Sequence, residues 1–202
     1  VFTTALAYVA LRLLGVPPDD PLAASARRWL RSRPGGVLAI PTWGKVWLAL
    51  LDLYGWEGTN PFPPELFLLP EWLPLHPVRF YCHTRYIYLA IASLQGGRFR
   101  ARLGPIGDEL RAELYDRPYG SIDFAAHRHD VAESDLHVRP GPLLRAAYDA
   151  LRRLERHRIP SLRARALAFC HDRIVHEQRR TRYLALSPVN GLGVFVFAAV
   201  NA

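Results

Sequence analysis

The sequence predicts an all-α protein built from antiparallel helix pairs. Apolar residues recur at helical spacing over most of the 202 residues. No stretch alternates apolar and polar residues as a half-buried strand would, and no glycine-flanked run of β-branched residues occurs. Because 50% of the residues are hydrophobic, a chain of this length can bury the core of one or two domains.

Glycine and proline mark the ends of the first three helices. A helix over 4–14 ends at a glycine that two prolines follow closely. Asp20 is a predicted N-cap for a second helix over 21–31, whose first residue is proline. A third helix over 44–54 is apolar on most sides, so we expect it to be well buried.

The following segment, 55–77, interrupts the helical pattern with six prolines between Pro61 and Pro77. Aromatic residues and leucines lie between these prolines, which argues against disorder. We therefore expect a long aromatic and proline-rich loop that side-chain packing holds in place.

Beyond this loop the helical pattern returns. Ser121 is expected to cap a short helix, and the last two helices are amphipathic with arginine-rich outer faces. The expected helices cover 82–94, 106–115, 121–126, 143–156 and 162–178.

The net charge of +8 comes from arginine, because Lys45 is the only lysine. The arginines gather in runs such as 152–153, 156–158 and 179–182, which could bind nucleic acid or an anionic membrane. We favour solvated helix faces, and no nucleic-acid partner, because no zinc-finger spacing or RNA-binding motif accompanies the charge. The segment His127-Arg128-His129 is likewise interpreted as a solvated helix end.

The sequence contains no clear motif for a metal or cofactor site. Cys170, His171, His176 and Glu177 are metal-ligand types, but their spacing does not stack them on one helical face. No glycine-rich phosphate loop or dinucleotide fingerprint is present, so we expect no metal and no cofactor. Two cysteines are too few for a disulfide framework, which favours a reducing compartment.

The block over 40–88 carries the clearest functional signal. It holds four of the five tryptophans and closes on Cys82-His83-Thr84-Arg85. Aromatic faces stabilise a cation by roughly 0.5–2 kcal/mol each, and an imidazole can accept a proton near neutral pH. This combination predicts one wall of a site for a large apolar ligand that carries positive charge during its reaction. The alternative for His83 is an ordinary hydrogen-bonded core histidine.

Three segments of the chain resemble the oxidosqualene cyclase family, which includes lanosterol and cycloartenol synthases. They are TALAYVALRLLGVPPDDP, GGVLAIPTWGKVWLALLDLYGWEG and PPELFLLPEWLPLHPVRFYCHTRYIYL, and weaker similarity persists to SPVNGLGVFVF. The resemblance implies an α/α-toroid and an enzyme that cyclises 2,3-oxidosqualene to a triterpene alcohol without a cofactor. It further implies that 1–202 is an incomplete part of one toroid, the inserted domain of a two-domain cyclase.

The resemblance also assigns residues by position. Trp43 matches a tryptophan that lines the cavity, and Tyr81 stands where the family usually has another. His83 matches the histidine of the histidine–tyrosine pair that assists the final deprotonation, and Thr84 replaces a cysteine. The family further implies a monotopic attachment to the cytoplasmic side of a membrane, for which Tyr86–Leu94 is the candidate segment. The alternative for this segment is a core helix.

One absence limits the expected activity. The family's acid lies in an Asp-Cys-Thr-Ala-Glu motif, which this chain lacks, as it lacks the repeated glutamine-to-tryptophan motifs. We therefore expect this chain to be an internal part of a longer polypeptide and inactive without the remaining half of the cyclase.

Other classes stay open. They are a squalene-hopene-type cyclase that acts on squalene and a non-enzymatic basic module that binds anionic membrane or nucleic acid. Which alcohol a cyclase would form is open too.

Overall fold

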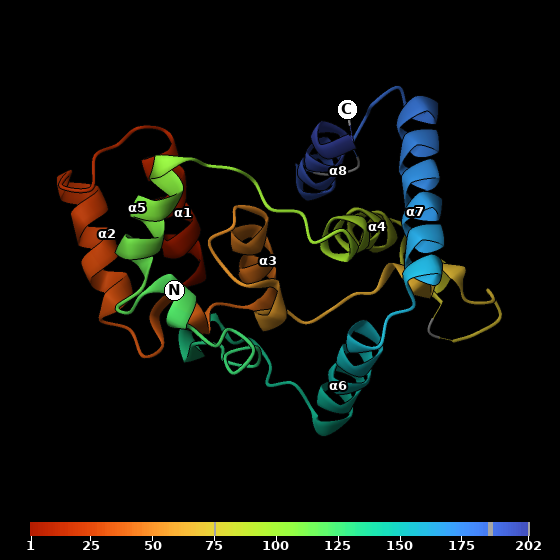
Figure 1. The fold of residues 1–202 in the computed structure, drawn as a ribbon, viewed down its shortest axis with the longest axis horizontal. Helices are drawn as coiled ribbons and strands as arrows, with labels where there is room; N and C mark the ends of the chain where they lie inside the picture. Colours follow the sequence, from red (N-terminus) through yellow and green to blue (C-terminus); the bar gives the residue numbers. More distant parts are fainter. Residues whose placement is uncertain (75, 186–187, 202) are drawn as a thin grey trace. The chain divides into compact units, whose positions relative to one another are not determined.

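The fold consists of two compact helical units, which are described separately. The computed structural model describes the backbone of residues 1–74, 76–185 and 188–201, where every regular element is a helix. Unit 1 comprises Val1–Asn60 and Arg100–Gly141, and unit 2 comprises Pro61–Phe99 and Pro142–Ala202 (Figure 1). The prediction of an all-α protein is confirmed. None of the described helices is both long and apolar enough to cross a bilayer.

Unit 1 contains α1 (Phe2–Leu13), α2 (Pro21–Arg31), α3 (Thr42–Leu50) and α5 (Pro105–Leu114). In Figure 1, α1, α2 and α5 lie side by side, and each of the three contacts the other two. Tyr8 of α1 is fully buried and donates a hydrogen bond of 2.8 Å to Glu113 of α5. Arg12 forms an ion pair with the same carboxylate, at 3.0 Å.

Local signals explain where α2 and α3 begin and end. The side chain of Asp20 accepts hydrogen bonds from the backbone N–H groups of Leu22 and Ala23, which confirms the predicted N-cap. Helix α3 ends earlier than expected, because Asp52 adopts a left-handed conformation with φ of 55°. The Leu53 N–H then bonds to the Leu48 carbonyl at 2.8 Å, which is the Schellman arrangement of a helix C-terminus.

Unit 2 is organised around α4 (Cys82–Gly96). Helices α7 (Pro160–Arg180) and α8 (Pro188–Asn201) both pack on α4, and α7 also packs on the short 3-10 helix η3 (Pro64–Leu68). Figure 1 shows α4 nearly end-on and α7 in the plane of the picture, so these two helices cross. Helix α6 (Pro142–Arg156) completes the unit and buries none of its residues.

The aromatic and proline-rich connection contains more regular structure than the sequence predicts. It includes three 3-10 helices: η2 (Trp56–Gly58), η3, and η4 (Pro77–Arg79). Prolines stand at the first turns of η3 and η4, where a missing N–H costs nothing. The prolines that end α-helical periodicity therefore begin these short helices.

Two further predictions were wrong. No helix forms over 121–126: the Ser121 hydroxyl donates to the Pro118 carbonyl, and a 3-10 helix, η5, covers Tyr119–Ser121. The segment from His127 is not a solvated helix end either, because Arg128 is buried and donates to the carbonyls of Glu57 and Thr59. Helix α8 was not expected from the sequence.

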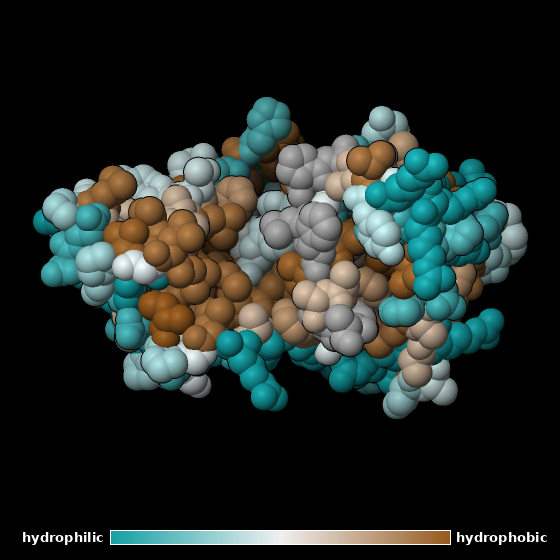
Figure 2. Space-filling model, turned by 90° about the horizontal axis from the view of Figure 1, so that it is seen from above, coloured by the Kyte–Doolittle hydropathy of each residue, from teal (hydrophilic) through white to brown (hydrophobic). Residues whose placement is uncertain are grey.

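The surfaces of the two units differ in polarity. On the face seen in Figure 2, apolar side chains cover much of unit 1, whereas hydrophilic side chains gather over the part of unit 2 where α7 ends. The arginines of the predicted solvated runs on α6 and α7 are exposed, except for half-buried Arg152. This agrees with solvated helix faces for those runs.

Candidate functional site

The four residues expected in the site belong to different units. Trp43 lies on α3 of unit 1, whereas Tyr81, His83 and Thr84 lie at the start of α4 in unit 2. Each group is therefore described within its own unit.

Trp43 lies in the first turn of α3 and is half-buried. Its ring stacks edge-to-face on Trp47, with the ring centroids 5.4 Å apart and an interplanar angle of 90°. The next residue, Gly44, packs closely against Phe2: a Cβ atom at position 44 would lie 2.6 Å from the Phe2 ring. Two tryptophan rings on one helix thus form a rigid aromatic surface in unit 1.

Directly behind this surface lies a buried cation, Lys45. Its Nζ atom is fully buried and donates hydrogen bonds of 2.6–3.2 Å to three backbone carbonyl groups, those of His127, Arg128 and Asp130. Burial lowers the pKa of Lys45 to about 8. The three carbonyls match the three donors of an ammonium group, so Lys45 ties the turn at 127–130 to α3.

At the start of α4, Tyr81 is 75% exposed, and His83 and Thr84 are half-buried. The rings of Tyr81 and His83 are nearly parallel, with an interplanar angle of 7° and centroids 6.4 Å apart. An imidazole beside a phenol ring can present its nitrogen to a ligand while the phenol offers a π face. His83 is thus accessible at a helix start rather than enclosed as a core histidine.

An aromatic cluster connects the proline-rich loop to α4. The Phe62 ring lies 4.4 Å from that of Tyr88, 6.1 Å from Phe67 and 6.3 Å from Phe80. The side-chain oxygen of Gln95 accepts a 2.8 Å hydrogen bond from the Phe62 N–H. The loop is therefore held on α4 by contacts between aromatic rings and by a hydrogen bond from the loop backbone to a side chain of α4.

A second anchor of the loop is ionic. The Arg163 side chain of α7 is 8% exposed and pairs with Glu65 of η3 at 2.6 Å and with Glu155 of α6. It also donates to the Gly96 carbonyl at the end of α4. One guanidinium thus joins four elements of unit 2.

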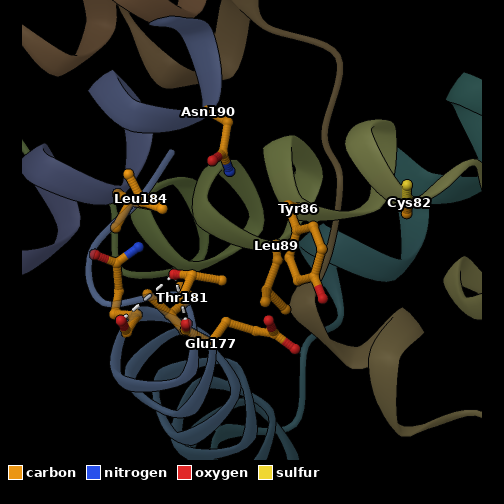
Figure 3. A pocket seen from close by; sticks show the side chains of 10 residues that line it. Cys82, Tyr86, Leu89, Glu177, Thr181, Leu184 and Asn190 are labelled. Carbon is orange, nitrogen blue, oxygen red and sulfur yellow. Dashed lines mark hydrogen bonds between the residues drawn. The ribbon is translucent and has the colours of Figure 1, made fainter. Parts of the chain in front are cut away.

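A pocket lies between α4, α7 and α8, entirely within unit 2. Figure 3 shows Tyr86 and Leu89 of α4 facing Glu177 and Thr181 of α7 across it, with Asn190 reaching in from α8. Its volume is about 210 Å³. Cys82 lines this pocket, but the neighbouring His83 is not among its lining residues.

The candidate membrane segment is largely inside unit 2. From Leu89 to Leu94 every side chain of α4 except that of Ser93 is buried, and α7 and α8 pack on the helix. Tyr86, Ile87 and Tyr88, at the start of the segment, are half-buried.

Among the described residues, no group of three or more histidine, cysteine or acidic side chains could hold a metal ion. Cys170 is buried, and burial raises the pKa of its thiol to about 12.

Sequence reasoning missed four buried cations: Arg12, Lys45, Arg128 and Arg163. Lys45 had a signal, since a single lysine within an apolar helix must find buried acceptors. The arginines had no such signal, because each has an acceptor far away in the sequence: Glu113 is 101 residues from Arg12, Thr59 is 69 from Arg128, and Glu65 is 98 from Arg163.

The fold is all-helical in the described residues, and the comparison with known families gives its class. Residues 1–201 match the family described as "Squalene-hopene cyclase N-terminal domain", and the chain belongs to it. Within this class the chain is similar to sterol-forming enzymes. It is 43% identical to lanosterol synthase of Homo sapiens and 42% identical to that of Pneumocystis carinii, over 94% of this chain and 26% of each relative. It is 37% identical to cycloartenol synthase of Dictyostelium discoideum, over 94% of the chain and 27% of the relative. The chain thus spans about a quarter of the length of these relatives.

Proposed function

We propose that this chain is part of an oxidosqualene cyclase, an isomerase that converts 2,3-oxidosqualene into a cyclic triterpene alcohol. The similarity to lanosterol synthases over 94% of the chain carries this proposal. The chain spans only about a quarter of those relatives, so the proposal concerns a contribution to a larger active site. Within the toroid of such an enzyme, residues 1–202 supply one wall of the cavity.

His83 is the proposed catalytic residue. An unprotonated imidazole nitrogen accepts the proton that the last carbocation loses, and the electrons of the broken C–H bond form the product's double bond. The accessible position of His83 at the start of α4 supports this role, as does the parallel Tyr81 ring.

Trp43, Tyr81 and Thr84 are the proposed substrate-binding residues. The π faces of Trp43 and Tyr81 stabilise the cation without reacting with it, and both rings keep exposed surface. Thr84 adds a small hydroxyl group next to His83. The acid that opens the epoxide and the tyrosine partner of His83 come from the remaining part of the enzyme.

A chimeric enzyme tests the proposal. The matching quarter of human lanosterol synthase is replaced by this chain, and products from 2,3-oxidosqualene are identified by gas chromatography. We expect conversion by the chimera, none by the 202-residue chain alone, and an activity loss of about a hundredfold for His83→Ala in the chimera.

His157→Ala is the matched control, because His157 is exposed in the same unit; it should leave conversion unchanged. Turnover by the chain alone, or full activity of the His83→Ala chimera, would contradict the proposal. Conversion of squalene but not of oxidosqualene would support the squalene-hopene-type alternative.

Attachment to the cytoplasmic side of a membrane belongs to the same proposal. The apolar substrate supports it, and the half-buried residues Tyr86, Ile87 and Tyr88 offer the part of the candidate segment that a lipid surface could reach. Co-sedimentation of the active chimera with phosphatidylcholine vesicles is expected, and a chimera that stays entirely in the supernatant would count against it.

A further inference from the structure

None of the four residues proposed for the cyclase site lines the pocket of Figure 3. Cys82, Tyr86 and Leu89 are spaced so that they share one helical face, whereas Thr84 and Tyr88 fall on the opposite one. Tyr88 packs against the ring of Phe62 there. The pocket is therefore separate from the residues proposed to line the cyclase cavity.

The size and walls of the pocket define what could fill it. Leu89, Ile174, Leu184 and Val194 give it apolar walls, from all three helices and the segment before α8. A volume of about 210 Å³ lies below the roughly 300–1,000 Å³ that is typical of sites for drug-sized molecules. The pocket therefore suits a single apolar chain rather than a fused ring system.

Glu177 gives the pocket a polar end. Burial raises the pKa of Tyr86, and the negative charge of the facing Glu177 raises it further. A carboxylate has about four acceptor positions on its two oxygens, so Glu177 can accept a hydrogen bond from a ligand hydroxyl. Its negative charge repels a ligand carboxylate at the same place.

Thr181 does not offset that selectivity. Its hydroxyl group donates to the Glu177 backbone carbonyl at 2.8 Å, one turn back along α7. The proton of this hydroxyl is thereby directed into the helix, so Thr181 offers no donor to a ligand carboxylate.

We propose that this pocket binds a neutral single-chain aliphatic or isoprenoid alcohol, with the ligand hydroxyl donating a hydrogen bond to Glu177. The site is additional to the cyclase cavity, and its occupation requires no turnover. Its test is therefore independent of the test of the cyclase proposal.

Cys82 provides a direct measure of occupancy, because it is an exposed free thiol that lines the pocket. The 202-residue chain is treated with N-ethylmaleimide, and modification of each cysteine is followed by mass spectrometry, with and without decan-1-ol or decanoate. At about ten times its Kd, decan-1-ol should slow Cys82 alkylation about tenfold by mass action, whereas decanoate should leave the rate unchanged.

Two variants and a control test the role of Glu177 and whether the aliphatic part of the ligand enters this pocket. Glu177→Gln removes the repulsion but keeps an acceptor, so decanoate should then protect Cys82 as decan-1-ol does. Leu184→Trp, at a position that is 73% exposed, should narrow the entrance and reduce protection by the alcohol. Glu71→Gln makes the same charge change outside this pocket, at an exposed residue, and should alter neither result.

Circular dichroism checks that each variant is folded, and buried Cys170 should stay unmodified throughout. Absence of protection by decan-1-ol up to its solubility limit would overturn the binding site. Equal protection by the alcohol and the carboxylate in the unsubstituted chain would overturn the assignment of Glu177.

Discussion

At the scale of single residues, buried cations hold together segments of this protein that are distant in the sequence. Lys45, Arg128 and Arg163 all direct their donors at backbone carbonyls, and Arg163 also binds two carboxylates. A buried charge is tolerated only where such partners replace water. Each cation therefore fixes the segments that supply its acceptors.

Replacing Lys45 tests this interpretation. Lys45→Met keeps the length of the side chain but leaves three carbonyls without their donor, so we expect the free energy of unfolding to fall by about 3 kcal/mol. Urea unfolding at pH 7, followed by circular dichroism, measures it. The exposed Arg139→Met is a control that should change stability by less than about 0.5 kcal/mol.

The pH dependence of stability, compared between the unsubstituted chain and Lys45→Met, tests the burial of Lys45 a second time. The pKa of Lys45 is about 8 in the folded chain and 10.5 ordinarily, so between these values the unfolded chain binds more protons. The stability of the unsubstituted chain should therefore rise with pH from about 8 to 9.5, relative to Lys45→Met. A parallel pH dependence of both proteins would show that Lys45 titrates normally.

At the scale of elements, short-range signals account for the helices, whereas ion pairs and ring contacts account for the loop. Asp20 begins α2, and the Schellman turn at Asp52 ends α3. Neither feature explains why the segment from Pro61 to Phe80 packs on α4. That depends on Phe62, which contacts Tyr88 and Gln95, and on the Arg163 ion pairs.

Removal of the Arg163 side-chain charge should loosen η3, α6 and the end of α4 together. Arg163→Met leaves the largely buried Glu65 without its cation and leaves Glu155 only its more exposed partners Arg98 and Arg158, and we expect a loss of about 3 kcal/mol. Thermal unfolding compares it with Arg158→Met, which removes an exposed partner of the same Glu155. Equal and small effects of both variants would show that the buried network contributes no more than a surface pair.

At the scale of the whole molecule, the chain exposes apolar surface on an amphipathic helix. In α6, Leu143 is 85% and Leu154 is 60% exposed, on the face opposite the arginines. Exposed apolar surface of this kind favours association between molecules. In the proposed cyclase, other parts of the enzyme would cover it.

The chain alone should therefore associate with itself as its concentration rises. The double substitution Leu143→Glu and Leu154→Glu should lower the light scattering, because it removes apolar area on one helix face. Leu14→Glu, a single substitution at an 82% exposed leucine of unit 1, should lower it less. Scattering that is as strong in the double variant would assign the association to another surface.

The sequence by itself determined the helical class, the cap at Asp20, the family and the aromatic residues of the proposed wall. These depend on spacing and on neighbours within one or two helical turns, which a sequence displays directly. Only the tertiary structure decided that Lys45 and Arg163 are structural, that no helix forms at Ser121, and that Glu177 faces a pocket behind α4. Each of these depends on partners that are distant in the chain or on how helices pack, so periodicity could not reveal it.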